Sequence, residues 1–169
     1  MPIFDFWSGV RDLEPAAFAQ RYPDPFLIEL GGGGGAASAP GTGHTPTTVR
    51  PNAAGGGPPA PGRVHAVVKR QAERPEQILV GRSALNDVVL LARDVSKAHA
   101  WLGLLDRAWV VVDLASSYGT TVDGKRLAPH TPERLRSGAT IAFSSLQTLF
   151  VLPIDFPDTA RGLLEAGRI

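Results

Sequence analysis

The second half of the chain consists of short apolar runs, each separated from the next by residues that favour turns. None of the runs shows the period of an amphipathic helix, and their length and content of Val, Leu, Ile and aromatic residues are typical of strands. They cover residues 64–69, 78–80, 88–91, 99–105, 109–114, 140–143 and 147–152. The sequence therefore predicts an all-β protein built as an antiparallel β-sandwich.

The turns between these runs carry their own signals. Asn86-Asp87, Ser116-Ser117 and Ser137-Gly138 each separate two runs. Asp123-Gly124 is the sharpest signal, because an Asp-Gly pair suits the two-residue turn of a β-hairpin. We expect a hairpin at this position.

A glycine- and proline-rich segment interrupts the pattern at residues 31–62. It contains eleven glycines and six prolines, with Arg50 as its one charged residue. Such a segment buries too little apolar surface to offset the entropy of ordering it, which predicts a flexible insertion. Since the apolar run Phe26–Leu30 directly precedes it, we expect the insertion to separate two strands of one sandwich.

The predicted organisation has three parts. Residues 1–25 form an N-terminal extension with a short helix between Asp12 and Arg21, where Pro15 suits the first helical turn. Residues 26–154 form the sandwich, interrupted by the 31–62 insertion. Residues 155–169 form a tail in which a short helix is expected from Asp158 to Ala166.

Composition excludes several classes of protein. The 169 residues include no cysteine, which excludes disulfides, iron–sulfur clusters and thiol nucleophiles. The net charge of +1 lacks the broad basic field of a protein that coats nucleic acid. Neither a secretory signal nor an apolar span of about 18 residues is recognisable. We expect a cytoplasmic protein without a membrane or nucleic-acid partner; the excess of arginine over lysine, with abundant alanine, glycine and proline, favours a bacterial source.

Three predicted loops carry residues suited to an anion. Gly81-Arg82 ends one strand, Ser96 to His99 precede another, and Ser116 to Thr120 follow a third. Loops of a sandwich gather at its two ends, so side chains from separate loops can converge. A guanidinium, an ammonium and hydroxyl groups together suit one phosphate. The surplus of positive charge between residues 63 and 154, with twelve basic and eight acidic residues, agrees with a small anionic ligand.

Other chemistry finds little support. The histidines at positions 44, 65, 99 and 130 lack the spacing of metal ligands, and no phosphate-loop motif is present. Ser96, His99 and Asp113 superficially suggest a nucleophile triad, but the spacing and the missing Gly-x-Ser-x-Gly elbow argue against it. We therefore expect no enzyme activity, no metal and no cofactor.

Four blocks of the sequence together resemble the forkhead-associated (FHA) family. They are GRSALNDVVL, DVSKAHA, DLASSYGTTVDGKRL and LRSGATIAF, in the order and approximate spacing of that family. The resemblance covers about residues 63–153, with Phe26–Leu30 expected to supply the first strand. It implies an eleven-stranded β-sandwich whose loops at one end read a phosphothreonine peptide, without catalysis.

The resemblance also implies roles for individual residues. Arg82, Ser96 and Lys97 match positions that hold the phosphate, and Ser117 matches a position beside it. Four further residues match positions that shape the loops without touching the ligand: Gly81, His99, Gly119 and Thr120.

Tyr118 departs from the family pattern. Asparagine is most frequent at this position and holds the ligand backbone through its amide, whereas a phenol lacks the paired donor and acceptor. Two readings follow. The first is a phosphothreonine-binding signalling module whose partner is a Ser/Thr kinase, a kinase substrate or a component of a secretion system. The second is a structural protein-interaction scaffold with a vestigial phosphate site.

Overall fold

The computed structural model describes residues 14–30, 62–70 and 76–168. Most of the predicted N-terminal extension and nearly all of the predicted insertion, residues 31–61, lie outside the described residues. The described part contains two α-helices, α2 (Pro15–Arg21) and α3 (Phe156–Glu165), and a 3₁₀ turn, η1 (Pro153–Asp155). No helix in these ranges is long and apolar enough to cross a membrane.

Eleven strands are present in the described residues, and they form two sheets of six and five strands. The six-stranded sheet has the order β2-β1-β11-β10-β7-β8, and the five-stranded sheet has the order β4-β3-β5-β6-β9. The strands are β1 (Phe26–Glu29), β2 (Val64–Ala66), β3 (Ile78–Gly81), β4 (Val88–Val89), β5 (Ala100–Leu105), β6 (Ala108–Asp113), β7 (Thr120–Val122), β8 (Lys125–Arg126), β9 (Glu133–Arg134), β10 (Ala139–Phe143) and β11 (Leu146–Val151).

The predicted β-sandwich with short helical segments near both ends is confirmed. The strand pairs are antiparallel except for one, since β3 and β4 run parallel. Asp123 and Gly124 both have positive φ angles, 48° and 82°, and join β7 to β8 in the expected hairpin. The two-residue strands β8 and β9 carry no apolar run, which is why the sequence pattern missed them.

The sandwich core lies between the two sheets and is mainly aliphatic. It includes Leu90, Leu102 and Ile141, together with the aromatic rings of Phe143 and Phe150. Alternate residues of the strands supply these side chains, as the period of two in an extended chain requires. The core therefore holds the ends of the strands, and the loops that follow them, at fixed positions.

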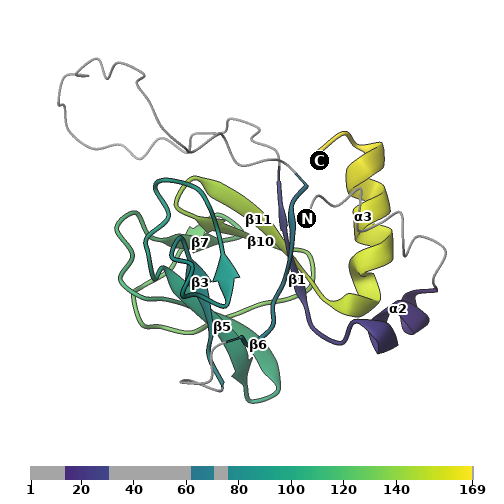
Figure 1. Cartoon of the computed structure of the whole chain (residues 1–169), viewed down its shortest axis with the longest axis horizontal. Coiled ribbons are helices and arrows are strands. Elements are labelled where there is room, and N and C mark those ends of the chain that lie inside the picture. Colours follow the sequence, from purple (N-terminus) through teal and green to yellow (C-terminus); the bar gives the residue numbers. More distant parts are fainter. Residues whose placement is uncertain (1–13, 31–61, 71–75, 169) are drawn as a thin grey trace.

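A second core lies between the six-stranded sheet and the two helices. β1 is buried on both faces, because Leu27 belongs to the sandwich core whereas Phe26 and Ile28 pack under the helices. Phe18 of α2 and Phe156 of α3 complete this second core. In Figure 1 the two helices lie together on one side of the sandwich, beside β1.

Candidate functional site

The three predicted loops lie at the same end of the five-stranded sheet. β3 ends at Gly81, antiparallel β5 begins at Ala100, and β6, antiparallel to β5, ends at Asp113. The opposite end of β5 leads into its hairpin with β6, which reaches the bottom of Figure 1. The loops following β3, preceding β5 and following β6 are therefore neighbours, and we call them together the loop end.

Gly81 allows the first two loops to pack closely. The backbone N–H of Arg82 donates to the Ser96 carbonyl at 2.9 Å, and that of Ser83 donates to the Lys97 carbonyl at 3.1 Å. A Cβ atom on Gly81 would lie 2.5 Å from the Lys97 carbonyl oxygen and 2.8 Å from that of Ser96. Both distances are too short for any side chain, so glycine is required for this contact.

Asn86 also connects these two loops, although the sequence indicated only a turn at this position. Its buried side-chain amide donates to the Lys97 carbonyl at 2.5 Å and to the Ser83 carbonyl at 3.0 Å. The carboxylate of neighbouring Asp87 accepts hydrogen bonds from Lys69 Nζ and from the Leu79 backbone N–H, both at 2.8 Å. The loop that carries Arg82 is thus anchored at its far side.

Ser96 and Ser117 bring the third loop to the second. The backbone N–H of Ser117 donates to Ser96 Oγ at 3.0 Å, and the two hydroxyl oxygens are 3.4 Å apart. Lys97 and Tyr118, the next residues of the two loops, are exposed, with Tyr118 64% accessible. Two hydroxyl groups, an ammonium and a phenol consequently lie on the surface of the loop end.

The Arg82 guanidinium is directed toward the second loop. Its Nε donates to the Val95 carbonyl at 3.2 Å, while the side chain remains exposed. Within the described residues, neither Arg82 nor Lys97 forms an ion pair. Both positive charges are therefore available to an anion from solvent.

His99 is fully buried beneath the loops and joins the second to the third. Its Nδ1 accepts from the Ser96 backbone N–H at 3.1 Å, which assigns the ring proton to Nε2, the donor to the Gly119 carbonyl at 3.3 Å. Burial lowers the pKa of His99, whereas the Asp113 carboxylate, 3.9 Å from Nε2, acts in the opposite direction. The neutral ring satisfies both hydrogen bonds.

Asp113 shapes the third loop, a role that the sequence analysis missed. Its carboxylate accepts from the Ser116 backbone N–H at 2.9 Å and from the hydroxyls of Ser116 and Thr120, both at 2.6 Å. Burial opposes ionisation, but these hydrogen bonds outweigh it and hold the pKa of Asp113 below its usual value. An aspartate three residues before a serine, as in Asp113 to Ser116, is the signal that could have found this turn.

The turn between β10 and β11 also reaches the loop end. The Ser144 backbone N–H donates to the Gly119 carbonyl at 3.1 Å. The Asp94 carboxylate accepts from Ser144 Oγ at 2.5 Å and from the Ser145 backbone N–H at 2.9 Å. Burial raises the pKa of Asp94, but hydrogen bonds from both serines outweigh this effect and lower it overall. Asp94 therefore serves the scaffold as an acceptor.

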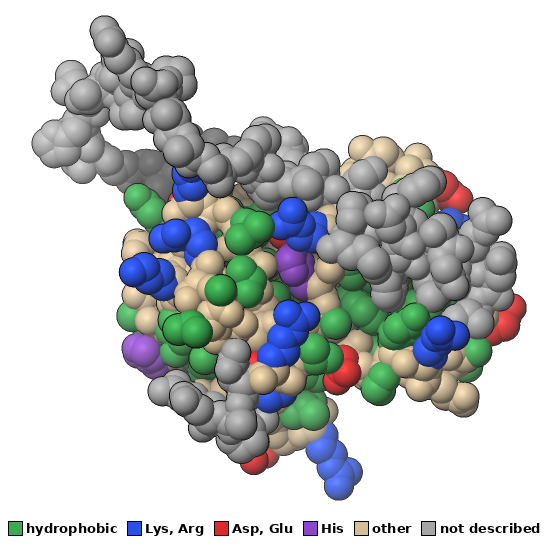
Figure 2. Space-filling view, in the orientation of Figure 1, with side chains coloured by type: hydrophobic (Ala, Val, Ile, Leu, Met, Phe, Trp, Pro, Cys, Tyr) green, Lys and Arg blue, Asp and Glu red, His purple; other side chains and the backbone are tan. Residues whose placement is uncertain are grey.

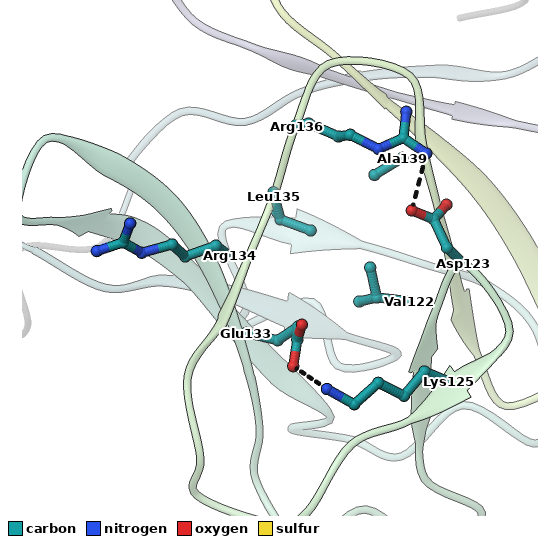
Figure 3. Close-up of a pocket in the computed structure, with 8 residues that line it drawn as sticks. All are labelled: Val122, Asp123, Lys125, Glu133, Arg134, Leu135, Arg136 and Ala139. Carbon is teal, nitrogen blue, oxygen red and sulfur yellow. Dashed lines mark hydrogen bonds and ion pairs between the residues drawn. The ribbon is translucent and has the colours of Figure 1, made fainter.

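The structure also contains a pocket away from these loops, between the β7–β8 hairpin and the segment joining β9 to β10 (Figure 3). Its charges are largely paired: Lys125 Nζ lies 3.0 Å from Glu133 Oε2, and Arg136 Nη2 lies 3.1 Å from Asp123 Oδ2. None of the predicted site residues lines it. In the part of the chain that the structure describes, no group of three or more His, Cys, Asp or Glu side chains could hold a metal ion.

Comparison with known proteins agrees with this arrangement. Residues 78–144, from β3 into the β10–β11 turn, match the family model of the FHA domain. The chain therefore contains an FHA domain. No curated protein matches the sequence.

Solved structures show the same fold. The FHA domain of a hypothetical protein from Arabidopsis thaliana is 20% identical, with a TM-score of 0.51 over 76% of this chain and 85% of that one. The N-terminal FHA domain of Saccharomyces cerevisiae Rad53p, solved with a phosphothreonine peptide, is 14% identical, with a TM-score of 0.47 over 80% and 98%. The FHA domain of the Chlamydia trachomatis protein CT664 is 18% identical, with a TM-score of 0.48 over 75% and 96%.

Proposed function

We propose that the loop end binds a phosphothreonine of a partner protein, with Arg82, Ser96 and Lys97 holding the phosphate and Ser117 and Tyr118 beside it. The observation that carries this proposal is the position of two unpaired cations, Arg82 and Lys97, beside the adjoining hydroxyls of Ser96 and Ser117. The FHA family match over the same loops supports it.

The chemistry of these groups suits a phosphate monoester. At neutral pH the group carries about 1.5 to 2 negative charges and three strong acceptor oxygens. A guanidinium supplies directed N–H donors, an ammonium supplies a compact charge, and serine hydroxyls supply neutral donors. Since Ser96 Oγ already accepts the Ser117 N–H, its own proton is free to be donated to a phosphate oxygen.

Gly81, His99, Gly119 and Thr120 position these groups without contacting the ligand in this proposal. Gly81 sets the approach of the first two loops, and His99 connects the second loop to the Gly119 carbonyl. Thr120 fixes the third loop through Asp113. A site assembled in advance loses less entropy when the ligand binds, which raises affinity.

The same geometry supports binding without catalysis. Both ring nitrogens of His99 are engaged with backbone groups, and the Ser96 hydroxyl contacts Ser117 rather than the ring. A serine nucleophile needs a base within hydrogen-bond distance of its hydroxyl. The proposed function is therefore recognition of a phosphorylated Ser/Thr kinase, kinase substrate or secretion-system component.

Titration of a phosphothreonine peptide library and its unphosphorylated counterpart tests the proposal. We expect binding of phosphorylated peptides only. Arg82→Ala is expected to weaken binding about 10-fold to 150-fold, since hydrogen bonds to charged groups contribute about 1.5 to 3 kcal/mol. Arg134→Ala, which removes an exposed arginine from β9, is the matched control and is expected to bind normally.

Folding of both variants is verified by circular dichroism and melting curves. A folded Arg82→Ala protein with affinity within about threefold of wild type would show that Arg82 is not the phosphate anchor. Failure of the wild type to bind any phosphorylated peptide would reject the proposed function altogether.

A scaffold with a vestigial phosphate site is the second candidate function, and Tyr118 favours it. Its exposed phenol cannot supply the paired amide contacts of the asparagine usual in the family. Tyr118→Asn distinguishes the candidates: tighter phosphopeptide binding indicates a weakened site, and weaker binding indicates that the phenol contacts the ligand. Absence of binding by both proteins supports the scaffold.

A further inference from the structure

Arg126 extends the loop end beyond the proposed phosphate site. It belongs to β8, pairs with Thr121 of β7 and is exposed. A Cβ atom on Gly119 would lie 2.6 Å from Arg126 Nη2, 2.7 Å from Cζ and 3.1 Å from Nε. The guanidinium therefore occupies the space that a side chain at position 119 would need, next in sequence to Tyr118.

The charge of Arg126 is not neutralised within the described residues, where it forms no ion pair. The nearest carboxylates in sequence are used elsewhere, since Asp123 pairs with Arg136 and Glu133 pairs with Lys125. The carboxylates of Asp94 and Asp113 accept hydrogen bonds from their own scaffold. Figure 2 likewise shows Lys and Arg side chains spread over the sandwich with few acidic ones among them on the viewed face.

The loop end thus presents one more cation than a phosphate requires. Arg82 and Lys97 together balance the 1.5 to 2 negative charges, approximately, of a phosphothreonine. Arg126 remains as a third positive charge on the far side of the loop that carries Ser117 and Tyr118. An isolated guanidinium matches a carboxylate well, because its planar fork can donate two parallel hydrogen bonds.

From this placement we propose that Arg126 forms a second anion subsite, which binds the carboxylate of an aspartate or glutamate flanking the phosphothreonine. This inference rests on the proposed function and adds a rule of peptide selection to it. The ligand lies across the 116–119 loop, with its phosphate at Arg82, Ser96 and Lys97 and an acidic side chain at Arg126.

The test uses a phosphothreonine peptide that binds the wild type, with alanine, aspartate or lysine placed in turn at each of the positions flanking the phosphothreonine. At one position, aspartate is expected to bind about 2-fold to 5-fold more tightly than alanine, as for an exposed ion pair. The readout is this ratio of affinities, which corrects for any general weakening of a variant.

Arg126→Ala is expected to bring the ratio to about one, and Arg126→Glu to reverse the preference toward lysine at the same position. Arg134→Ala, the control, is expected to keep the wild-type ratio. Melting curves show whether each variant is folded.

Two results would overturn the inference while leaving the proposed function standing: a wild type that binds phosphopeptides with no acidic preference at any position, or an Arg126→Ala protein that keeps the preference. Absence of any phosphopeptide binding by the wild type would instead overturn both. Retention of the preference together with its loss in Arg134→Ala would assign the subsite to β9.

Discussion

The loop end and the helix-covered face of the sandwich differ in the contacts that hold them. At the loop end, buried Asn86, His99 and Asp113 each connect to other loop groups through directed hydrogen bonds. On the helix-covered face, Phe26 and Phe156 lie 4.6 Å apart between ring centroids, and Phe18 stacks on Phe156 at 5.1 Å. One region depends on geometry and the other on buried apolar area.

This difference separates stability from recognition. Apolar burial is non-directional and grows with area, so it stabilises the fold without defining the position of any polar atom. Hydrogen bonds of buried polar groups are worth less on balance, but leaving one partner unsatisfied is costly. We therefore expect changes under the helices to affect folding, and changes at the loop end to affect both folding and binding.

The largest effect on stability is expected under the helices. Phe156→Ala should lower the free energy of unfolding by about 3 to 5 kcal/mol, since it removes a fully buried ring and leaves a cavity. Urea denaturation measures this loss. Phosphopeptide affinity of the remaining folded protein should be unchanged.

Ile154→Ala is the control, because Ile154 lies in η1 beside Phe156 but is about half exposed. A loss of less than about 1 kcal/mol in Phe156→Ala would contradict the assigned role of the second core. Weakened peptide binding by folded Phe156→Ala would show that the two regions are coupled.

His99→Ala should have the next largest effect. Removing the ring leaves the Ser96 N–H and one contact of the Gly119 carbonyl unsatisfied, which costs about 1 to 3 kcal/mol. Melting curves and peptide titration should both change, unlike those of Phe156→Ala. His130→Asn, at an exposed histidine, should leave both measurements as in the wild type.

A matched pair of glycines provides a finer comparison. Gly119 and Gly138 both have φ of 82°, so alanine at either position costs about 1 to 2 kcal/mol in backbone strain. Only at Gly119 does the new Cβ meet another group, the Arg126 guanidinium. Gly119→Ala should therefore reduce peptide affinity as well as stability, whereas Gly138→Ala should reduce stability alone.

Equal affinity of the two glycine variants for a phosphopeptide would show that the contact of Gly119 with Arg126 has no part in binding. Isothermal titration with one peptide decides this point.

The smallest effect is expected from pH. The pKa of His99 is lowered below its ordinary value of 6.5, chiefly by burial, so the unfolded chain takes up the proton first as the pH falls. The contribution of His99 to the free energy of unfolding is full above pH 6.5 and decreases between that value and the lower pKa of the folded state. His99→Gln should lack this decrease, which urea denaturation at several pH values measures as a difference from wild type.

A contribution of the opposite sign, with His99 stabilising the fold more as the pH falls below 6.5, would contradict the neutral ring. The carboxylate of Asp113 acts in a separate range, because its lowered pKa removes stability only as the pH falls below 3.8.

The sequence by itself determined the fold class, the Asp123-Gly124 hairpin and the C-terminal helix. These features depend on local patterns: apolar runs with turn residues between them, an Asp-Gly pair, and apolar residues at helical spacing such as Phe156, Ala160 and Leu163. The three loops were likewise recognisable, since their residues occur in contiguous blocks.

Only the tertiary structure decided which distant residues meet. Asp94 contacts the β10–β11 turn, and the Arg126 guanidinium fills the space at Gly119. β1 is buried on both faces because two helices from opposite ends of the chain cover it. Contacts of this kind arise from the pairing of strands far apart in the sequence, and a local pattern records the tendency to form a strand but not the partner it packs against.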